Sequence, residues 1–323
     1  MTQGDENGEW ELRTPVAFFI YNRPETTRRV FEAIRQVKPP RLYVVADGPR
    51  GDRPGDSERC EAARALIDVD WDCKVRKNYS DVNLGCSGRV AGGLDWVFSD
   101  VEEAVVVEDD CLPHPSFFRF CGELLERYRD EDEVMSVTGQ NVQFGRNGSG
   151  YSYYFSRFHH IWGWATWRRA WSSYDREMKR WPELKDVMLR DSLGNRRAEA
   201  YWRRVLQETY EGGIDSYAFR WMYSCWIKGG LGVTSGVNLV SNIGFGSDAT
   251  HTRDSGRNPF ANIPACEMRF PLRHPPEIEV NGRADEYTQN TLYDPTLQVR
   301  VKWKLRRTLS EVEDALKGKK GVA

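Results

Sequence analysis

Several features common in other protein classes are missing from this chain of 323 residues. No C-x-x-C pair occurs among the seven cysteines, and their odd number and scattered positions indicate neither a disulfide framework nor a zinc site. We therefore expect a reducing, cytoplasmic environment. No apolar run approaches the roughly 18 residues of a membrane span, and the polar, acidic first residues lack the pattern of a secretion signal.

Positive charge is not in excess either. The formal net charge is -2 at pH 7, whereas a nucleic-acid-binding protein normally carries a basic surplus, so we expect no nucleic-acid partner. Two glycine-rich phosphate-binding motifs, G-x-G-x-x-G and G-x-x-x-x-G-K-[ST], are also absent. Their absence argues against dehydrogenases and P-loop enzymes, and it means that any diphosphate must be bound by side chains or by a metal.

One short apolar run ends abruptly in three acids, Ala104-Val105-Val106-Val107-Glu108-Asp109-Asp110. Its length and its β-branched residues predict a buried strand of a parallel sheet. Ligands of such sheets bind at the carboxyl ends of the strands. Because three neighbouring carboxylates repel one another, this strand end requires a cation, or a ligand that carries one.

The chain around this run alternates between strand-like and helix-like segments. Strands are expected at residues 16–21, 42–46, 74–78 and 134–138, and helices at 25–37, 57–67, 87–98 and 116–128, with Ser57 as the cap of the second helix. This alternation predicts right-handed βαβ units and an open, mostly parallel α/β sheet with flanking helices.

Charged residues follow three of the expected strands: Arg23, Asp47 and the acidic run that ends at Asp110. In an open parallel sheet these positions share one edge. An aspartate can accept a hydrogen bond from a nucleobase, an arginine can bind a phosphate with two N–H groups, and carboxylates can hold a divalent ion on a diphosphate. Taken singly, each is equally compatible with a solvated turn. Together they predict a nucleoside diphosphate site.

The run from Val105 to Asp110, followed by Phe117-Phe118, resembles the Glu-Asp-Asp metal motif of nucleotide-sugar glycosyltransferases with the GT-A fold. The likeness extends over about residues 15 to 252. It is greatest to inverting β-1,2-N-acetylglucosaminyltransferases that act on N-glycan cores and to bacterial hemolysin-like nucleotide-diphospho-sugar transferases. It implies that Asp110 binds Mn²⁺ or Mg²⁺, that Glu108 and Asp109 face the donor sugar and ribose, and that Asp47 contacts the base. Arg23 and Arg89 complete the expected nucleotide-sugar contacts of this half.

Residues 151–171 are dense in aromatic side chains, which stack well on sugar rings. An acceptor wall is one interpretation. The helical spacing of Trp164, Trp167 and Trp171 instead predicts a helix that buries its tryptophans, and we favour the core for Trp167 and Trp171. The Trp162-Gly163-Trp164 turn is similar to a glycine-containing loop beside the sugar site of the family, so Trp164 is a candidate donor contact.

Two further candidates lie in the second half of the chain. Asp215 precedes an aromatic helix, where it could cap that helix; the resemblance instead implies that it is the general base. The glycine-rich, polar stretch 238–252 is similar to the segment that covers the donor in the family, and such lids exclude water from an activated donor. Its His251 would contact the diphosphate or the metal, or else be a surface histidine.

The expected organisation is a loose tail at 1–14, a nucleotide-sugar-binding half at 15–140, a catalytic and acceptor half of the same domain at 141–298, and an amphipathic helix at 299–323. The first turns of that last helix are basic. This pattern suits peripheral contact with anionic lipid at the inner membrane face, although a docked helix or a dimer contact is the commoner outcome.

The resemblance implies a single displacement with inversion at the anomeric carbon, in which Asp215 takes the proton of the acceptor hydroxyl. A UDP-sugar donor and N-acetylglucosamine are carried by the resemblance alone, and the acceptor is left open between a glycan, a lipid-linked intermediate, a protein and a small molecule. Two other classes stay open. A noncatalytic carbohydrate-binding protein would use the 12 tryptophans, and a metal-dependent phosphohydrolase would need a second ligand cluster.

Overall fold

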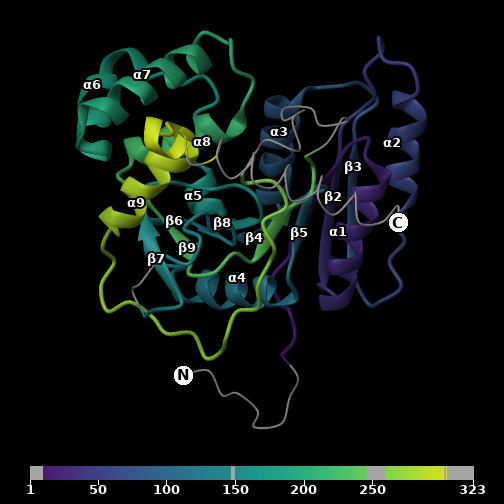
Figure 1. Cartoon of the computed structure of the whole chain (residues 1–323). Helices are drawn as coiled ribbons and strands as arrows, with labels where there is room; N and C mark the ends of the chain where they lie inside the picture. Colours follow the sequence, from purple (N-terminus) through teal and green to yellow (C-terminus); the bar gives the residue numbers. More distant parts are fainter. Residues whose placement is uncertain (1–9, 147–149, 246–258, 302, 304–323) are drawn as a thin grey trace, which may run out of the picture.

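The structure is a computed structural model that describes residues 10–146, 150–245, 259–301 and 303. The strands of its central sheet are Val16–Ile20 (β1), Arg41–Ala46 (β2), Lys74–Tyr79 (β3), Glu103–Glu108 (β4), Val134–Thr138 (β6), Tyr153–Ser156 (β7), Trp164–Trp167 (β8) and Leu231–Ser235 (β9). Cys111–Pro113 (β5) and Val240–Asn242 (β10) form a separate antiparallel pair. The central sheet has the order β3-β2-β1-β4-β8-β6-β9-β7 (Figure 1).

Most neighbouring strands of this sheet are parallel. β3, β2, β1 and β4 run in one direction, and β6 is parallel to β9. β8 lies antiparallel between β4 and β6, and β7 is an antiparallel edge strand. The predicted open, mostly parallel α/β sheet is therefore confirmed, and the ends of β1, β2 and β4 lie at one edge.

Helices cover both faces of the sheet. They are Pro24–Val37 (α1), Asp56–Ala65 (α2), Cys86–Phe98 (α3), Pro115–Arg127 (α4), Arg168–Trp171 (α5), Trp181–Leu193 (α6), Arg196–Tyr210 (α7), Tyr217–Ile227 (α8), Gly282–Thr288 (α9) and the π-helical turn Gln289–Tyr293 (η1). Phe18 of β1 stacks on Phe31 of α1, and Tyr43 of β2 contacts Trp96 of α3 edge-on. Since Phe18 is in register with Val44, the adjacent Tyr43 points to the opposite face.

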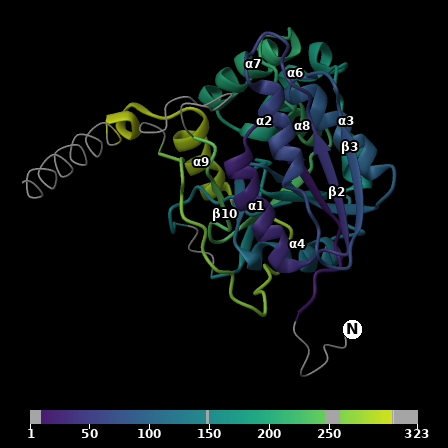
Figure 2. The ribbon, with the colours of Figure 1, turned by 90° about the vertical axis from the view of Figure 1, so that its right-hand side faces the viewer.

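Helices α6, α7 and α8 bury a second apolar cluster, apart from the core of the sheet. Trp202 packs there against Phe158, Trp226 and Tyr293, with ring centroids 6.1, 4.9 and 4.7 Å away. Its indole N–H donates to Gln289 Oε1 at 2.8 Å, so the buried ring has no unpaired donor. Figures 1 and 2 show α6 and α7 together at the end of the molecule away from α4. This cluster holds α8 in place.

Residues 164–171 differ from their prediction. Trp164–Trp167 is a strand rather than part of a helix, because it pairs with β4 on one side and β6 on the other. Trp164 packs against Trp221 of α8, and Trp167 donates its indole N–H to the Leu125 carbonyl of α4. A strand buried on both faces has no polar side, so tryptophan spacing alone does not separate it from a helix. The predicted core positions of Trp167 and Trp171 are confirmed.

Other corrections are smaller. α2 begins at Asp56 with Gly55 as its N-cap, so Ser57 does not cap it. The last part of the expected catalytic and acceptor half, for which no helix was predicted, contains α9 and η1. Most of the predicted helix at 299–323 lies outside the described residues. Among the helices that the structure describes, none is long and apolar enough to cross a membrane.

Asp285, in α9, ties that helix to the end of β7. Ser156 Oγ donates to its carboxylate at 2.5 Å, and the Arg157 backbone N–H donates at 3.0 Å. Burial nevertheless raises the pKa of Asp285 to about 6, against these two hydrogen bonds. The folded chain therefore binds a proton at this carboxyl more tightly than the unfolded chain does.

This raised pKa predicts a pH dependence of stability. Between about pH 4 and pH 6 the folded state binds more protons at Asp285 than the unfolded state, so the free energy of unfolding falls as pH rises through this window. We expect Asp285→Asn to remove about 2 kcal/mol of the decline between pH 4.5 and 7, measured by urea unfolding. Glu286→Gln, at the exposed next position, is the control. An unchanged decline in Asp285→Asn would contradict the assignment.

Candidate active site

The carboxyl ends of β1, β2 and β4 are adjacent in the sheet. Phe19 of β1 is in register with Glu108 of β4, and Ile20 is in register with Ala46 of β2. Arg23 follows β1, Asp47 follows β2, and the acidic run lies at the end of β4. Arg23 meets the acidic run directly, as the two aspartates that follow Glu108 are its ion-pair partners. The shared edge predicted for these side chains is thus observed.

Asp109 and Asp110 share Arg23, and with Glu108 we call them the acidic cluster. Arg23 Nη2 lies 3.1 Å from Asp109 Oδ1, and Nη1 lies 2.8 Å from Asp110 Oδ2. Asp109 is almost completely buried and also accepts the Tyr21 backbone N–H at 2.9 Å. Burial raises the pKa of Asp109, while the Arg23 charge opposes this rise. Arg23 therefore supplies one positive charge to three carboxyl groups.

Glu108, the third member of the acidic cluster, has a different partner. The Tyr217 hydroxyl at the start of α8 donates to Glu108 Oε1 at 2.7 Å, and Tyr217 is buried. Burial and the neighbouring Asp110 charge both raise the pKa of Glu108. This carboxyl is consequently held by a neutral donor, and the cluster keeps an excess of negative charge that favours an added cation. The sequence pattern did not identify Tyr217, although it lies two residues after Asp215.

Asp215 reaches the same place from the loop between α7 and α8. A Cβ placed on Gly85, the N-cap residue of α3, would lie 3.1 Å from Asp215 Oδ2. Burial raises the pKa of the adjacent Cys86 thiol, and the negative charges of Glu108, Asp215 and Asp110 raise it further. The charges of three acids from two distant parts of the chain thus act on the Cys86 thiol.

The environment of Asp215 also bears on its alternative role as a helix cap. The N-cap of α8 is Ser216, and no side chain caps that helix end. Asp215 is exposed, so its carboxylate is accessible to a ligand. The capping alternative therefore does not hold, and Asp215 presents an exposed carboxylate near the acidic cluster.

Asp47 is buried at the end of β2, where the chain itself provides its partners. Its Oδ1 accepts the backbone N–H groups of Gly48 and Leu84 at 2.9 Å, and Oδ2 accepts Asn83 Nδ2 at 3.0 Å. Burial raises the pKa of Asp47, and these hydrogen bonds oppose the rise. A carboxylate has about four acceptor positions, so Oδ2 retains capacity for a further donor such as a base N–H.

Arg89, in the first turns of α3, is buried near Asp47. It donates to the carbonyl oxygen and to Oδ1 of Asn78 at the end of β3. Burial lowers the pKa of Arg89, and the Asp47 charge partly restores it. The guanidinium of Arg89 is thus engaged by Asn78 rather than by Asp47. In this conformation it supports the end of β3.

Trp164 requires a correction as a donor contact. It is fully buried against Trp171 and Trp221, so its side chain is not available to a sugar. The partly exposed aromatic residue of that turn is Trp162, which lies edge-on to Phe245 with ring centroids 5.6 Å apart. The aromatic wall is also reduced, because seven of the twelve tryptophans are buried.

The predicted donor-covering segment is described only in part. His251 lies outside the described residues, as does most of the glycine-rich stretch. The part before it crosses the acidic cluster: the Ile243 N–H donates to the Asp110 carbonyl at 2.7 Å, and a Cβ on Gly244 would lie 2.3 Å from Asp110 Oδ2. Only glycine fits at this point.

The acidic cluster has oxygen ligands but no complete metal site of its own. Among the described residues, no group of three or more His, Cys, Asp or Glu side chains is arranged to hold one. The available oxygens are carboxylates, which suit Mn²⁺ or Mg²⁺, and Mg²⁺ commonly takes one or two protein carboxylates while phosphates and water complete its shell. A metal ion at the acidic cluster would therefore need oxygens from a bound ligand or from water in addition to the carboxylates.

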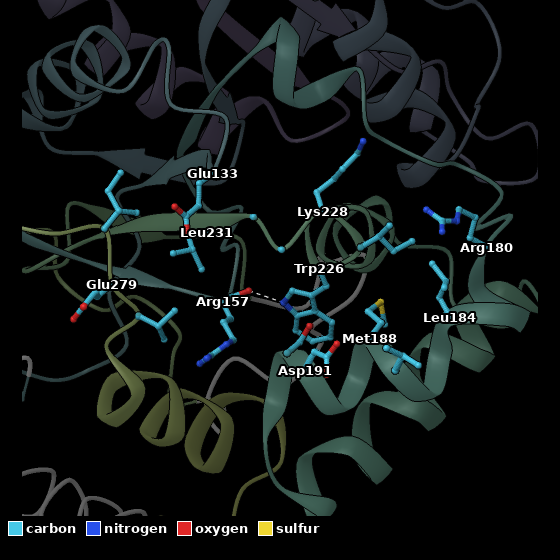
Figure 3. Close-up of a pocket in the computed structure, with 17 residues that line it drawn as sticks. Glu133, Arg157, Arg180, Leu184, Met188, Asp191, Trp226, Lys228, Leu231 and Glu279 are labelled. Carbon is cyan, nitrogen blue, oxygen red and sulfur yellow. Dashed lines mark hydrogen bonds between the residues drawn. The ribbon is translucent and has the colours of Figure 1, made fainter.

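A separate cavity of about 700 Å³ lies at the other end of α8 (Figure 3). Its lining includes Glu133, Met188, Trp226 and Lys228, and the Trp226 indole N–H donates to the Arg157 carbonyl at 2.7 Å. It adjoins the first residue of β9 rather than the strand ends that carry the acidic cluster. None of the predicted site residues lines it.

No family model and no curated protein matches this chain. Among solved structures, it is similar to the galactosyltransferase LgtC in complex with donor and acceptor sugar analogs, with 14% identity over 54% of this chain and a TM-score of 0.33. A mannosyltransferase from Pyrobaculum calidifontis, in complex with GDP-Man and Mn²⁺, gives 13% identity over 67% of this chain and 69% of its own, with a TM-score of 0.36. The match spans 66% of the LgtC chain, a little under two thirds.

Proposed function

We infer that this chain is a metal-dependent glycosyltransferase of the GT-A type, which moves a sugar from a nucleotide diphosphate sugar to a hydroxyl acceptor. The observation that supports this most directly is the convergence of four features at one sheet edge. Asp47 is a buried carboxylate with spare acceptor capacity, and Arg23 is the arginine. Glu108 to Asp110 form the acidic cluster with excess negative charge, and Asp215 is the exposed aspartate.

Each side chain has a role in the proposed reaction. Asp47 accepts a hydrogen bond from the base, and Arg23 binds the diphosphate. A divalent ion, Mn²⁺ or Mg²⁺, held at Asp110 would neutralise charge on the leaving diphosphate. Asp215 takes the proton of the acceptor hydroxyl while that oxygen attacks the anomeric carbon from the side opposite the diphosphate, which inverts the configuration. The resemblance adds UDP and N-acetylglucosamine as the first donor to examine.

A thermal-shift screen tests this proposal. UDP, GDP, dTDP, CDP and their sugars are each added with Mn²⁺ and with chelator, because a ligand that binds only the folded state raises the melting temperature by mass action. We expect a metal-dependent increase for one nucleotide class. We also expect Asp110→Asn to abolish that increase and the exposed Asp132→Asn to retain it. No shift with any nucleotide on folded wild-type protein would refute the donor site, and sugar binding that survives Asp110→Asn would indicate a noncatalytic carbohydrate-binding protein.

A further inference from the structure

Arg23 holds the position that a metal ion at Asp110 would need. Its Nη1 is 2.8 Å from Asp110 Oδ2 and its Nη2 is 3.1 Å from Asp109 Oδ1, so one guanidinium spans both carboxylates. A second cation at Asp110 Oδ2 therefore has to compete with this guanidinium.

The chain before the donor-covering segment closes over the same ion pair. A Cβ on Gly244 would lie 2.3 Å from Asp110 Oδ2 and 2.7 Å from Arg23 Nη1. The Gly244 backbone is fixed there, as its N–H donates to Asn242 Oδ1 at 2.9 Å and Ile243 donates to the Asp110 carbonyl. Within the part of the chain that the structure describes, Asp110 Oδ2 is therefore covered by Arg23 and Gly244.

We propose that Arg23 is a resident counter-cation that competes with the divalent ion for Asp110, and that the donor diphosphate releases this carboxylate by giving the guanidinium another partner. The inference rests on the proposed function. A guanidinium binds a phosphate in the same two-pronged geometry as a carboxylate. The Nε–H of Arg23 is also buried without a hydrogen-bond partner among the described residues, so it has a donor available for an added oxygen. Arg23 can keep its ion pair with Asp109 while it exchanges the ion pair with Asp110 for one with a phosphate.

Competition makes the metal and the diphosphate bind together. Without nucleotide, Mn²⁺ meets the guanidinium charge at Asp110 and can reach Oδ2 only by breaking the Arg23–Asp110 pair, which weakens its binding. With a diphosphate present, the guanidinium has its new partner and Asp110 is free for the ion. Coupling between two ligands is reciprocal, so Mn²⁺ strengthens diphosphate binding by the same factor. Arg23 is then a positioning residue that keeps the ion out of the acidic cluster until the donor arrives.

The test measures Mn²⁺ binding to the full chain in the absence of nucleotide, by electron paramagnetic resonance of the free ion. We expect Arg23→Gln to bind Mn²⁺ at least about tenfold more tightly than wild type, since two like charges at contact distance repel strongly. Arg35→Gln is the matched control, because it removes one charge from a half-buried position of the same helix α1, where Arg35 pairs with Asp70. Equal Mn²⁺ affinity in wild type and Arg23→Gln would overturn the proposal.

Two additions keep the result unambiguous. Arg23→Gln leaves the buried Asp109 without its cation, so the double variant Arg23→Gln/Asp109→Asn, which removes that charge and keeps Asp110, is measured alongside with a thermal melt of each protein. UDP and GDP are then titrated into wild type. Tighter Mn²⁺ binding in the variants with no diphosphate binding to wild type would support the competition, but it would refute the donor site and with it the release of Asp110 by a diphosphate. Diphosphate binding to wild type without tighter Mn²⁺ binding in either variant would refute the competition alone.

Discussion

Replacing Asp215 by Asn is expected to lower kcat by about 10²- to 10⁴-fold, the usual contribution of a general base. The amide cannot take a proton from the acceptor hydroxyl, whereas its size and position stay the same. Asp215 is exposed and does not cap α8, so we expect little change in stability. It also leaves the ion pairs of Arg23 intact, and metal-dependent nucleotide binding should therefore persist.

The measurement needs an active donor, identified by the thermal-shift screen, and a steady-state assay of sugar transfer with Mn²⁺. Glu211→Gln, at the exposed end of α7 four residues earlier, is the control and should retain wild-type kcat. A fall in kcat with an unchanged melting-temperature shift for the donor separates a chemical role from a binding role. If Asp215→Asn retains most of its kcat, the base lies elsewhere and Asp215 has no catalytic role.

The sheet edge that carries these residues could be predicted from the sequence. The runs that become β1, β2 and β4 are short, apolar and rich in β-branched or aromatic residues, which is typical of strands buried on both faces. Each is followed directly by charged or turn-forming residues. Because parallel strands place their carboxyl ends at one edge, Arg23, Asp47 and the acidic cluster could be brought together without a structure.

Their mutual contacts could not be predicted in this way. Arg23 forms ion pairs with Asp109 and Asp110, and Tyr217 donates a hydrogen bond to Glu108. Both contacts depend on the distances between elements that are far apart in the chain. Sequence periodicity also fails where a strand is covered on both sides, as at Trp164, whose burial removes it from the donor site. Pairing with β4 and β6 makes residues 164–167 a strand, and no local sequence pattern reveals such pairing.

Asp56 was likewise missed, although it connects two of the segments that form the site. It is fully buried and accepts the Tyr21 hydroxyl at 2.7 Å and Asn22 Nδ2, both from the chain between β1 and Arg23. From the loop after β2, the Arg50 backbone N–H donates to it at 2.9 Å and the Arg50 side chain donates through Nε and Nη2 at 3.1 Å. The turns that carry Arg23 and Asp47 thus share one anchor.

Asp56→Ala is expected to lower the free energy of unfolding at pH 7 by about 3 kcal/mol, because donors on both segments, among them the buried Asn22, lose their acceptor. Burial alone would raise the pKa of Asp56, but the bonds from Arg50, Tyr21 and Asn22 outweigh it and hold that pKa well below its usual range. The contribution of Asp56 is therefore complete above the unfolded-state pKa of about 3.9 and is lost as the pH falls through the lower, folded-state value.

Urea unfolding at pH 7 and at pH 3 measures both parts of this expectation. The difference between wild type and Asp56→Ala should be largest at pH 7 and should begin to shrink below about pH 4, where the unfolded chain but not the folded one takes up the proton. Asp52→Ala, at an exposed position of the same loop, should change stability by less than about 0.5 kcal/mol. Equal unfolding midpoints for Asp56→Ala and Asp52→Ala at pH 7 would show that this carboxylate does not anchor the two turns.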